Sequence, residues 1–329
     1  MKNREIRVAE LPQAELKPEH FALHDAPMPD VAEGEVLLRT RLMSIDAANR
    51  SWMKGATYRE AVKAGDPMPT YAVCEVVESR SDRLAVGDVV ATEGVWADYI
   101  ARKAHRCQKL PKVEPLTHLM SVYGIAGKTA FHGLIHVGKP VAGETVLVSA
   151  AAGSVGGFVG QIAKALGCRV VGIAGGAEKC DWVVNELGFD ACVDYRDPGM
   201  FKALRKACPN GVDIYFDNVG GAILETALFL MNERGRVVCC GAISQYDTEG
   251  ASGPRNLPGL VVVKRLRMEG FIVMDFADKD AVALRALQHW VASGQIKVFE
   301  DVVDGLENAP QALIGLLAGD NRGKRMVRL

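Results

Sequence analysis

The sequence lacks several features that would assign it at once to a membrane, secreted or nucleic-acid-binding class. No apolar run in its 329 residues approaches the roughly 18–20 residues that a membrane-spanning helix needs. The first eight residues, MKNREIRV, lack the apolar core of a signal peptide. The formal net charge is −1, which gives no electrostatic argument for binding nucleic acid or an anionic membrane. We therefore expect a cytoplasmic protein that binds neither nucleic acid nor membrane.

The sequence also lacks the common metal-binding and redox motifs. None of its eight cysteines forms a Cys-x-x-Cys pair, which argues against a zinc ribbon and against a redox dithiol. Most of the cysteines lie in apolar runs, where buried free thiols are expected. His132 and His136 are one helical turn apart, but no carboxylate or cysteine stands at ligand spacing from them. We expect no metal site, and the lack of a Gly-x-Ser-x-Gly elbow argues against acyl chemistry.

What is present divides the chain into two patterns. Residues 1–120 hold short apolar segments separated by Gly, Pro and Asp turns, which predicts a β-rich domain, a partly open barrel. Strands are expected there from about Ile6, Glu35, Ala72, Asp88 and Ala97. Residues 299–329 are predicted to return to this domain with a short strand, a helix and a closing strand.

Residues 121–298 alternate between apolar strands and helical patterns. Strands are expected to begin near Val146, Val170, Ala191, Asp213, Arg236 and Gly270. This alternation predicts an α/β domain with a doubly wound parallel sheet, the Rossmann architecture. Another helix is expected at residues 280–292. The glycine- and proline-containing stretch 241–268 is longer than a usual connection, and we interpret it as a functional loop over a cofactor.

The most informative motif lies at residues 144–166. Residues 146–148 form the continuous apolar run of a strand that is buried on both faces. The following stretch, 151–156 (AAGSVG), matches the dinucleotide fingerprint with alanine at its first glycine position. An amphipathic helix follows, whose free N–H groups and dipole attract a phosphate. The pattern predicts a dinucleotide site, the alternative being a tight strand-to-helix connection without a ligand.

The residues after the second strand of this unit indicate which dinucleotide binds. Folds that bind NAD usually place an acidic residue there to hydrogen-bond the ribose 2′-hydroxyl, but this chain has Gly175-Gly176. The missing carboxylate, with Lys179 nearby, suits a 2′-phosphate, and Tyr195 and Arg196 are further possible donors. The sequence thus favours NADP(H) over NAD. The alternative is that Glu178 reaches the ribose instead.

Several longer segments carry a resemblance to a known family. They are residues 148–156 (VSAAAGSVG), 171–179 (VGIAGGAEK), 187–190 (LGFD), 215–221 (YFDNVGG), 240–246 (CGAISQY), 266–271 (LRMEGF) and 319–324 (GDNRGK). In these segments the chain resembles the zinc-independent medium-chain dehydrogenase/reductases, within them the leukotriene B4 dehydrogenase/prostaglandin reductase branch, which includes bacterial curcumin reductase. The resemblance covers most of the chain and is densest from residue 120 to 324.

The resemblance implies NADPH-dependent reduction of the carbon–carbon double bond of α,β-unsaturated ketones and aldehydes. It also implies a GroES-like domain at 1–120 completed by 299–329, an NADP-binding Rossmann domain at 121–298, and a homodimer. The cofactor contacts that it implies are Gly153, Ser154, Val155, Gly156, Lys179, Tyr195, Asn218, Cys240, Gly241, Ala242, Ile243, Ser244, Gln245, Tyr246, Phe271, Ile272, Val273 and Asn321.

Some of these positions have a plain structural alternative. Asn218 could cap the helix that starts near Gly220, residues 271–273 could be sheet core, and Asn321 could serve only its turn. The chain also departs from the family. It has DAANR at 46–50 where many relatives have Asp-Pro-Tyr-Met-Arg, and Val263 stands where animal and plant relatives have a tyrosine tied to catalysis.

For the reaction we hypothesise that hydride goes to the β-carbon of an enone, which leaves negative charge on the carbonyl oxygen. Tyr246 is the first candidate for the catalytic hydrogen-bond donor, because its segment follows the fifth strand at the edge where ligands bind. The alternatives are a cofactor hydroxyl, a water molecule, or the weaker candidates Tyr58 and Tyr123. Trp52 and Trp96, with Met53, are candidate pocket walls, although core packing is the commoner fate of such residues.

Three other functions remain open at this point. Quinone reduction on the same fold is the closest one, and carbonyl–alcohol interconversion is disfavoured by the lack of zinc-ligand patterns. The third is a protein that binds NADPH without turnover, which the residues at Val263 and Ala48 keep open.

Overall fold

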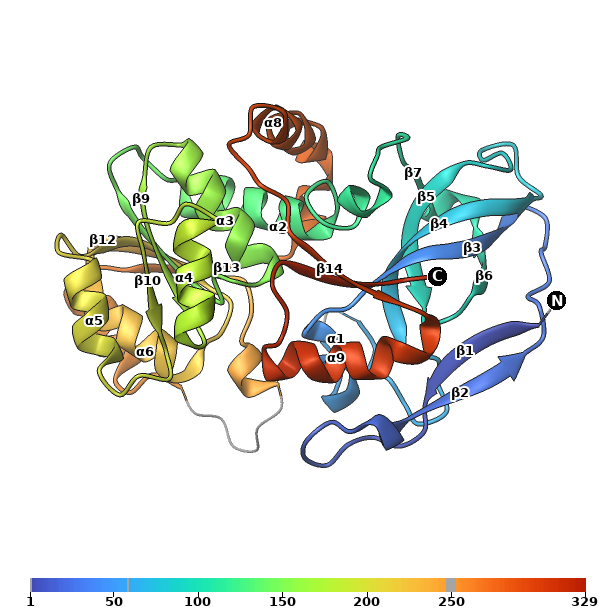
Figure 1. The fold of residues 1–329 in the computed structure, drawn as a ribbon, viewed down its shortest axis with the longest axis horizontal. Coiled ribbons are helices and arrows are strands. Elements are labelled where there is room, and N and C mark those ends of the chain that lie inside the picture. Colours follow the sequence, from blue (N-terminus) through green and yellow to red (C-terminus); the bar gives the residue numbers. More distant parts are fainter. Residues whose placement is uncertain (1, 58, 247–252) are drawn as a thin grey trace. The chain divides into compact units, whose positions relative to one another are not determined.

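The computed structural model describes residues 2–57, 59–246 and 253–329. The chain forms two compact units (Figure 1). The first comprises Met1–Met120, Glu300–Asp320 and Arg325–Leu329, and the second comprises Ser121–Phe299 and Asn321–Lys324. Residues 299–329 were predicted to return to the first unit. They do so only in part, because Phe299 and residues 321–324 belong to the second unit. The Gly323 N–H donates to the Ala152 carbonyl at 2.9 Å, and the Lys324 N–H donates to the Phe299 carbonyl at 3.1 Å.

The first unit is built from antiparallel strands. Its strands are β1 (Asn3–Val8), β2 (Phe21–Ala26), β3 (Glu35–Ser44), β4 (Pro69–Ser79), β5 (Val89–Val95), β6 (Tyr99–Lys103), β7 (Gln108–Lys109), β14 (Glu300–Asp304) and β15 (Lys324–Arg328). A seven-stranded sheet has the order β14-β15-β3-β4-β5-β7, with β6 paired to β3, and β1 pairs with β2 separately. The long strand β3 serves two hydrophobic clusters, since Val36 packs in one and Met43 in the other.

The strands β2 and β7 and the helix α1 (Ala48–Lys54) of the first unit were not predicted from the sequence. Strand β2 was not expected, because its burial pattern shows only one fully buried residue, Phe21, and so lacks apolar alternation. The short helix α1 was not expected either. It holds the part of the chain that departs from the family pattern. There Asn49 Nδ2 donates to the Pro69 carbonyl at 2.8 Å, and Arg50 Nη2 donates to the Ala14 carbonyl at 2.9 Å. The remaining helix of the unit is α9 (Ala309–Ala318).

The second unit contains the predicted doubly wound parallel sheet. Its strands are β8 (Thr145–Ser149), β9 (Arg169–Ala174), β10 (Ala191–Asp194), β11 (Val212–Asp217), β12 (Met231–Cys239) and β13 (Arg267–Gly270). Their order is β10-β9-β8-β11-β12-β13, and each neighbouring pair is parallel. The α/β class is confirmed. The last strand was misplaced, because Gly270 ends β13 rather than starting it.

Helices cover both faces of this sheet (Figure 1). They are α2 (Ile125–His132), α3 (Ser154–Ala165), α4 (Ala177–Asn185), α5 (Met200–Ala207), α6 (Gly221–Leu230), α7 (Leu257–Lys264) and α8 (Asp280–Ala292). Alternate strand residues face opposite layers. Val146 and Val148 pack with α2, α3, α4 and α8, whereas Leu147 packs with α5, α6 and α7.

The stretch 241–268 is not one long loop. It contains a 3₁₀ turn at Ile243–Gln245 and the helix α7, whose Leu257, Leu260 and Val261 pack on the sheet. The glycine and proline residues that suggested a loop include Pro258, which lies in the first turn of α7, where proline is tolerated. Residues 247–252 lie outside the described part of the chain.

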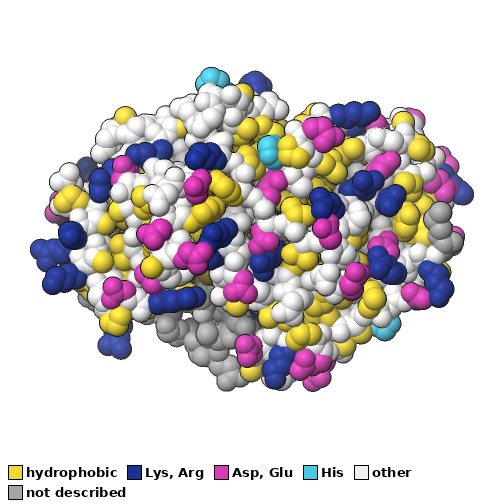
Figure 2. Space-filling view, viewed as in Figure 1, with side chains coloured by type: hydrophobic (Ala, Val, Ile, Leu, Met, Phe, Trp, Pro, Cys, Tyr) yellow, Lys and Arg dark blue, Asp and Glu magenta, His cyan; other side chains and the backbone are white. Residues whose placement is uncertain are grey.

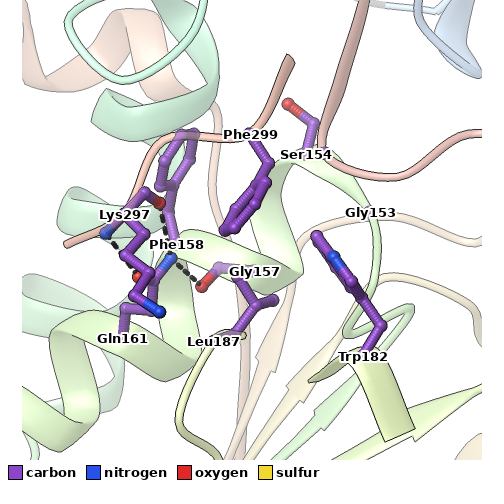
Figure 3. Close-up of a pocket in the computed structure, with 10 residues that line it drawn as sticks. Gly153, Ser154, Gly157, Phe158, Gln161, Trp182, Leu187, Lys297 and Phe299 are labelled. Carbon is purple, nitrogen blue, oxygen red and sulfur yellow. Dashed lines mark hydrogen bonds between the residues drawn. The ribbon is translucent and has the colours of Figure 1, made fainter. Parts of the chain in front are cut away.

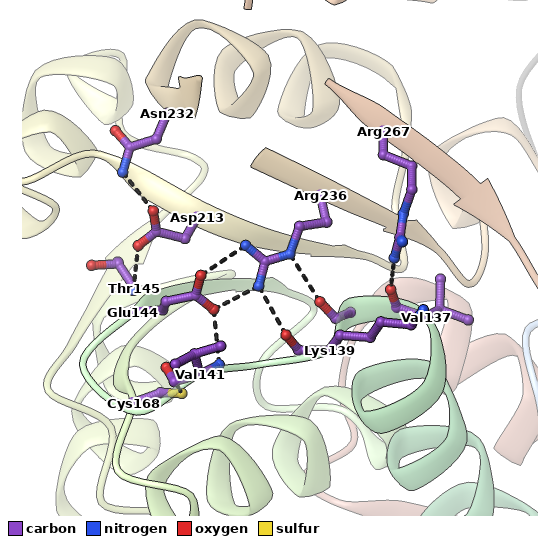
Figure 4. A network of polar contacts seen from close by, with 11 residues as sticks. Val137, Lys139, Val141, Glu144, Thr145, Cys168, Asp213, Asn232, Arg236 and Arg267 are labelled. Atoms are coloured by element: carbon purple, nitrogen blue, oxygen red, sulfur yellow. Dashed lines mark hydrogen bonds and ion pairs between the residues drawn. The ribbon is translucent and has the colours of Figure 1, made fainter. Parts of the chain in front are cut away.

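A polar network ties the strands together at their amino ends (Figure 4). Arg236 and Glu144 form a bidentate pair, with contacts of 2.8 Å and 2.6 Å, and Arg236 also donates to the Gly138 and Lys139 carbonyls at 3.0 Å. Burial raises the pKa of Glu144, but the bonds from Arg236 and from the Val141 N–H outweigh this and hold the pKa below its ordinary value. Bidentate arginine–carboxylate geometry is the strong form of this interaction, so this edge of the sheet is fixed.

The surface carries side chains of both charges. On the face shown in Figure 2, acidic and basic side chains are interspersed, in line with the net charge of −1. Among the residues that the structure describes, no helix has both the length and the apolar character needed to cross a bilayer.

Candidate dinucleotide-binding site

The predicted cofactor residues all lie in the second unit, at or just beyond the carboxyl ends of its strands or in the turn Asn321–Lys324. Gly153 follows β8, Lys179 lies in α4 after β9, and Tyr195 follows β10. On the other half of the sheet, Asn218 follows β11, residues 240–246 follow β12, and residues 271–273 follow β13. Ligands of open parallel sheets bind at this edge. The topology thus brings together residues that are up to 168 positions apart in the sequence.

The turn between β8 and α3 has the close packing that the fingerprint requires. Ala150 adopts a left-handed conformation, with φ of 50°, and its carbonyl accepts a hydrogen bond from the Gly153 N–H at 2.9 Å. A Cβ atom on Gly156 would lie 2.3 Å from the same carbonyl oxygen. Only glycine therefore allows α3 to start this close to β8, which presents the free N–H groups of its first turn at the edge of the sheet.

An unpaired polar atom at this turn tests whether a phosphate fits. The Oγ atom of Ser154, the first residue of α3, is buried and has no hydrogen-bond partner among the described residues. Buried polar atoms in folded proteins nearly always have a partner. A phosphate oxygen at the helix start would accept a bond from this hydroxyl as well as from the N–H groups. The residues present therefore fit a pyrophosphate.

A small hollow lies behind the fingerprint turn (Figure 3). It is lined by Gly153, Ser154, Gly157, Phe158, Gln161, Trp182, Leu187, Lys297, Phe299 and Gly323. Its volume of about 10 Å³ has room for no more than about one water molecule. Gln161 closes it by accepting from the Lys297 N–H at 2.7 Å and donating to the Lys297 carbonyl at 3.1 Å. The hollow is therefore too small for the dinucleotide.

The turn Asn321–Lys324 packs directly on the fingerprint. The Gly323 N–H donates to the Ala152 carbonyl, and Lys179 Nζ donates to the Asn321 carbonyl at 2.8 Å. The side chain of Asn321 donates to the Gly323 carbonyl at 2.9 Å, so this side chain has the turn-forming role that the sequence left open. The turn thus links the fingerprint to Lys179.

The candidate 2′-phosphate position has two basic side chains, Lys179 and Arg196, and a tyrosine beside it. Lys179 is half-buried at the start of α4, and Arg196 Nη1 would lie 3.8 Å from a Cβ atom on Gly176. The ring of Tyr195 covers Gly175, where a Cβ atom would lie 2.9 Å from the ring. Three donor side chains therefore surround the Gly175-Gly176 turn.

The acidic residues near this position are held by other partners. Glu178 forms an ion pair with Arg322. Asp194 accepts hydrogen bonds from the Gly176 N–H at 2.8 Å and from the Arg196 N–H at 2.9 Å. These two backbone bonds hold the pKa of Asp194 below its ordinary value. The pairing of Glu178 with Arg322 weakens the alternative in which Glu178 serves a ribose hydroxyl.

Asn218 does not cap the following helix. Its Nδ2 donates to the Ser149 carbonyl at 2.8 Å, and its N–H donates to Ser149 Oγ at 2.9 Å. The carboxylate of Asp217 instead accepts from the Val219 and Gly220 N–H groups, at 3.0 and 2.9 Å. These bonds form an Asx-type turn ahead of α6, whose N-cap residue, Gly220, has no side-chain cap. Asp217 was not among the predicted site residues.

Residues 240–246 lie against the end of β11. The Cys240 and Gly241 N–H groups donate to the Asp217 carbonyl at 2.9 and 3.1 Å, and the Ile243 N–H donates to the Asn218 carbonyl at 3.2 Å. The Tyr246 hydroxyl oxygen accepts from the Ala242 N–H at 3.2 Å. Because the phenol acts as acceptor in this bond, its own proton stays available to a further acceptor.

Residues 271–273 leave the sheet where β13 ends. Phe271 is half-buried and packs edge-to-face with Phe216, whereas Ile272 is 37% exposed. A Cβ atom on Gly133 would lie 2.5 Å from the Phe271 ring, so glycine makes room for that ring. The segment is therefore only partly sheet core.

The other tyrosine and aromatic candidates are placed as follows. Tyr123 is half-buried just before α2, and burial raises its pKa, while Tyr58 lies outside the described residues. Val263 is 69% exposed on α7. Trp52 and Trp96, with Met53, belong to a hydrophobic cluster of the first unit and are at most 7% exposed.

A cluster of two histidines, His132 and His136, lies between α2 and α8. His132 is fully buried, with its Nε2 atom 3.1 Å from Asp280, and Lys128 contacts the same carboxylate at 2.8 Å. The rings of His132 and His136 both stack on Phe276, at 5.1 and 5.4 Å. Sequence spacing alone missed the carboxylate, since Asp280 is 148 residues from His132. Across the described ranges, no group of three or more His, Cys, Asp or Glu side chains is arranged to hold a metal ion.

This cluster predicts a loss of stability in mild acid. Burial lowers the pKa of His132, against the raising effect of Asp280, and burial also lowers the pKa of His136. Because the folded state then binds fewer protons than the unfolded state, stability is full above the unfolded pKa of about 6.5 and is lost as pH falls below it. Each proton adds a slope of at most about 1.4 kcal/mol per pH unit. Unfolding in urea between pH 7.5 and 5 measures this slope.

His132→Leu should flatten the profile, and His289→Gln, an exposed residue on α8, should leave it unchanged. A profile that is the same in wild type and His132→Leu would contradict the assignment.

With this geometry in place, comparisons with known proteins are informative. A family model described as the N-terminal domain of oxidoreductase matches residues 4–110, and one described as zinc-binding dehydrogenase matches residues 154–289. The NADPH-dependent curcumin reductase of Escherichia coli (strain K12) is 41% identical over 335 residues, covering 100% of this chain and 97% of the relative. Prostaglandin reductase 1 of Bos taurus is 38% identical, covering 94% and 93%. The 2-alkenal reductase (NADP(+)-dependent) of Nicotiana tabacum is 40% identical, covering 90% and 88%.

Among solved structures, CurA from Vibrio vulnificus in complex with NADPH is 38% identical, with a TM-score of 0.94 over 99% of this chain and 98% of that one. A parallel-sheet unit with a dinucleotide fingerprint, joined in one chain to an antiparallel unit, fits the two-domain oxidoreductases that these comparisons identify. The chain belongs to the zinc-independent medium-chain dehydrogenase/reductases, in the leukotriene B4 dehydrogenase/prostaglandin reductase branch.

Proposed function

We propose that the protein is an NADPH-dependent reductase that transfers hydride to the carbon–carbon double bond of α,β-unsaturated ketones and aldehydes. The observation that carries the proposal is the convergence of the fingerprint turn, Lys179 and residues 240–246 at one edge of the parallel sheet. The relatives named as curcumin, prostaglandin and 2-alkenal reductases support the substrate class. When bound, NADPH supplies the hydride, and the protein supplies binding, orientation and hydrogen bonds.

Each group of residues at the carboxyl edge of the parallel sheet has a distinct role in this proposal. The first turn of α3 and Ser154 bind the pyrophosphate, and Lys179, with Tyr195, binds the 2′-phosphate. Residues 240–246 and 271–273, together with Asn218, orient the nicotinamide end. A donor aimed at the substrate carbonyl stabilises the negative charge that develops there, and Tyr246 is the proposed donor. The other candidates are a cofactor hydroxyl and a water molecule, with Tyr58 and Tyr123 as weaker candidates.

The direct test mixes the purified protein with NADPH and a simple enone and follows both NADPH loss and product. A saturated ketone supports the proposal, whereas an allylic alcohol would show that hydride goes to the carbonyl. A parallel panel of quinones tests quinone reduction. Tight NADPH binding in calorimetry without oxidation by any acceptor would identify a binding protein without turnover, and no binding at all would overturn the cofactor assignment.

Tyr246→Phe tests the proposed donor. Removal of the hydroxyl should lower kcat roughly a hundredfold, since one donor of this kind contributes about 3 kcal/mol, and should change the KM for NADPH little. Steady-state kinetics with one enone at saturating NADPH measures this. Tyr123→Phe tests the weaker candidate donor in the same assay, and Tyr99→Phe, in β6 of the first unit, is the control. A kcat within about threefold of wild type would instead assign Tyr246 to cofactor packing and favour another proton source.

We also propose a cytoplasmic homodimer. Strand β13 lies at one end of the sheet order, where an unpaired edge can pair with a second copy. The adjacent helix α7 exposes Val262 by 72% and Val263 by 69%. Light scattering should give twice the mass of one chain, and Val262→Glu/Val263→Glu should shift it toward the monomer. Val282→Glu, at a residue 53% exposed on α8, should not change the mass. A monomeric wild type would contradict the proposal.

A further inference from the structure

The end of strand β11 holds a buried carboxylate that neither the motifs nor the proposed chemistry accounts for. Asp217 is the last residue of β11 and is 3% exposed. Its Oδ1 atom accepts hydrogen bonds from the Tyr215 hydroxyl at 2.8 Å and from Ser149 Oγ at 3.3 Å. The same atom accepts from the Val219 and Gly220 N–H groups at 3.0 and 2.9 Å. Three donors thus converge on this oxygen, and the single proton of the Ser149 hydroxyl is shared between it and the Phe216 carbonyl, also at 3.3 Å.

The partners of Asp217 include the elements that carry the proposed cofactor contacts. Through its side chain it fixes the turn that leads from β11 into α6, including Asn218. Through its main-chain carbonyl it accepts from the Cys240 and Gly241 N–H groups, at 2.9 and 3.1 Å, and so holds the start of residues 240–246. One residue therefore sets the position of two contact segments that follow different strands.

Ser149 extends the network to the fingerprint. It is the last residue of β8, immediately before Ala150, and it is fully buried. Its Oγ lies within 3.3 Å of Asp217 Oδ1 and accepts from the Asn218 N–H at 2.9 Å, while its carbonyl accepts from Asn218 Nδ2 at 2.8 Å. The ends of β8, β11 and β12 are thereby joined in one hydrogen-bond network beneath the binding edge. Buried polar networks whose members are all satisfied fix a single local geometry.

We propose that Asp217 is a positioning residue for the dinucleotide, which holds Asn218 and residues 240–246 in the geometry that binds NADPH. The proposal rests on the proposed cofactor and adds a role for a residue that does not itself touch it. Loss of the carboxylate leaves the Val219 and Gly220 N–H groups without their acceptor, so the turn must rearrange to satisfy them. Asn218 and the start of residues 240–246 move with that turn.

The other end of the same strand supplies a matched control. Asp213, the second residue of β11, accepts from the Thr145 N–H and from Asn232 Nδ2, both at 2.8 Å (Figure 4). Like Asp217, it accepts from backbone and side-chain donors, but it lies at the amino ends of the strands. A purely structural role predicts the same consequences for the loss of either acid. A positioning role predicts that they differ in NADPH binding.

The test measures NADPH affinity by calorimetry and steady-state kinetics in Asp217→Ala, Asp217→Asn and Asp213→Ala, at a temperature where thermal unfolding shows each variant folded. Asp217→Ala should raise the dissociation constant and the KM for NADPH at least about tenfold, with a smaller change in kcat. Asp217→Asn should restore part of the affinity, because its amide oxygen still accepts from the two N–H groups. Asp213→Ala should bind NADPH within about twofold of wild type.

The outcomes separate the inference from the proposed function. Wild-type protein that does not bind NADPH would overturn the proposed function itself. Wild type that binds, with Asp217→Ala equally tight or Asp213→Ala equally weakened, would overturn the positioning role alone. If Asp217→Ala does not fold, Asp217→Asn carries the test, since it removes the charge and so weakens the bonds to the two backbone N–H groups. Asp217→Asn that binds NADPH as tightly as wild type would then contradict the role of Asp217.

Discussion

Lys179→Ala should raise the KM for NADPH about ten- to a hundredfold and leave the KM for NADH almost unchanged. A charge-assisted hydrogen bond to a phosphate contributes about 1.5–3 kcal/mol, and NADH has no 2′-phosphate to receive it. The structure strengthens this expectation, because Lys179 Nζ is held by the Asn321 carbonyl at the Gly175-Gly176 turn. Initial rates with each cofactor at one fixed enone concentration measure the two constants.

Lys164→Ala is the control for Lys179→Ala. Lys164, in the last turn of α3, pairs with Asp190 at 2.9 Å, and Lys164→Ala should change neither constant. Equal effects of Lys179→Ala on NADPH and NADH would show that the side chain does not meet the 2′-phosphate. In that case Arg196 would be the next residue to replace.

Gly156→Val should weaken NADPH binding at least about a hundredfold. The first added carbon would lie 2.3 Å from the Ala150 carbonyl oxygen and 2.9 Å from its carbon, both backbone atoms that cannot turn aside. The start of α3 must therefore move away from β8, and a misplacement of about 1 Å can reduce a rate or an affinity by about two orders of magnitude. Overpacking of this kind also lowers stability by about 1–3 kcal/mol.

Gly157→Ala is the matched control, one position further along the same helix. There the added carbon would lie 3.3 Å from Leu187 Cδ1, the end of a side chain that can shift. Calorimetric titration with NADPH and thermal unfolding of both variants separate lost binding from lost stability. If Gly156→Val bound NADPH as tightly as Gly157→Ala, the fingerprint turn would not be the pyrophosphate site.

The predictable part of the structure rests on local patterns. The apolar run at 146–148 and the fingerprint after it identify a buried strand, its turn and its helix, and the structure has all three. Helix α8 occupies residues 280–292 as its periodicity predicts. Strand ends in a parallel sheet lie at one edge, so the placement of Asn218 and residues 240–246 follows once the strands are located.

The unpredicted part rests on contacts between distant residues. The ion pair of Glu178 with Arg322 spans 144 positions, and the contact of His132 with Asp280 spans 148. No periodicity encodes such pairs, because they depend on how the finished fold places its turns. Strand β2 was missed for a different reason, since pairing with β1 rather than burial on one face defines it. The turn that Asp217 forms had a local signal, because an aspartate commonly accepts from the N–H group two residues on, here that of Val219.

The bidentate pair of Arg236 and Glu144 has a consequence for protein engineering. It lies at the amino ends of the strands, and among the described residues it shares no hydrogen bond with the turns that carry Lys179, Tyr195 or Asn218. Substitutions far enough apart to share no partner usually act independently. Substitutions in the turns that carry Lys179 and Tyr195 should therefore be able to change the preference between NADPH and NADH without changing the register of the parallel strands.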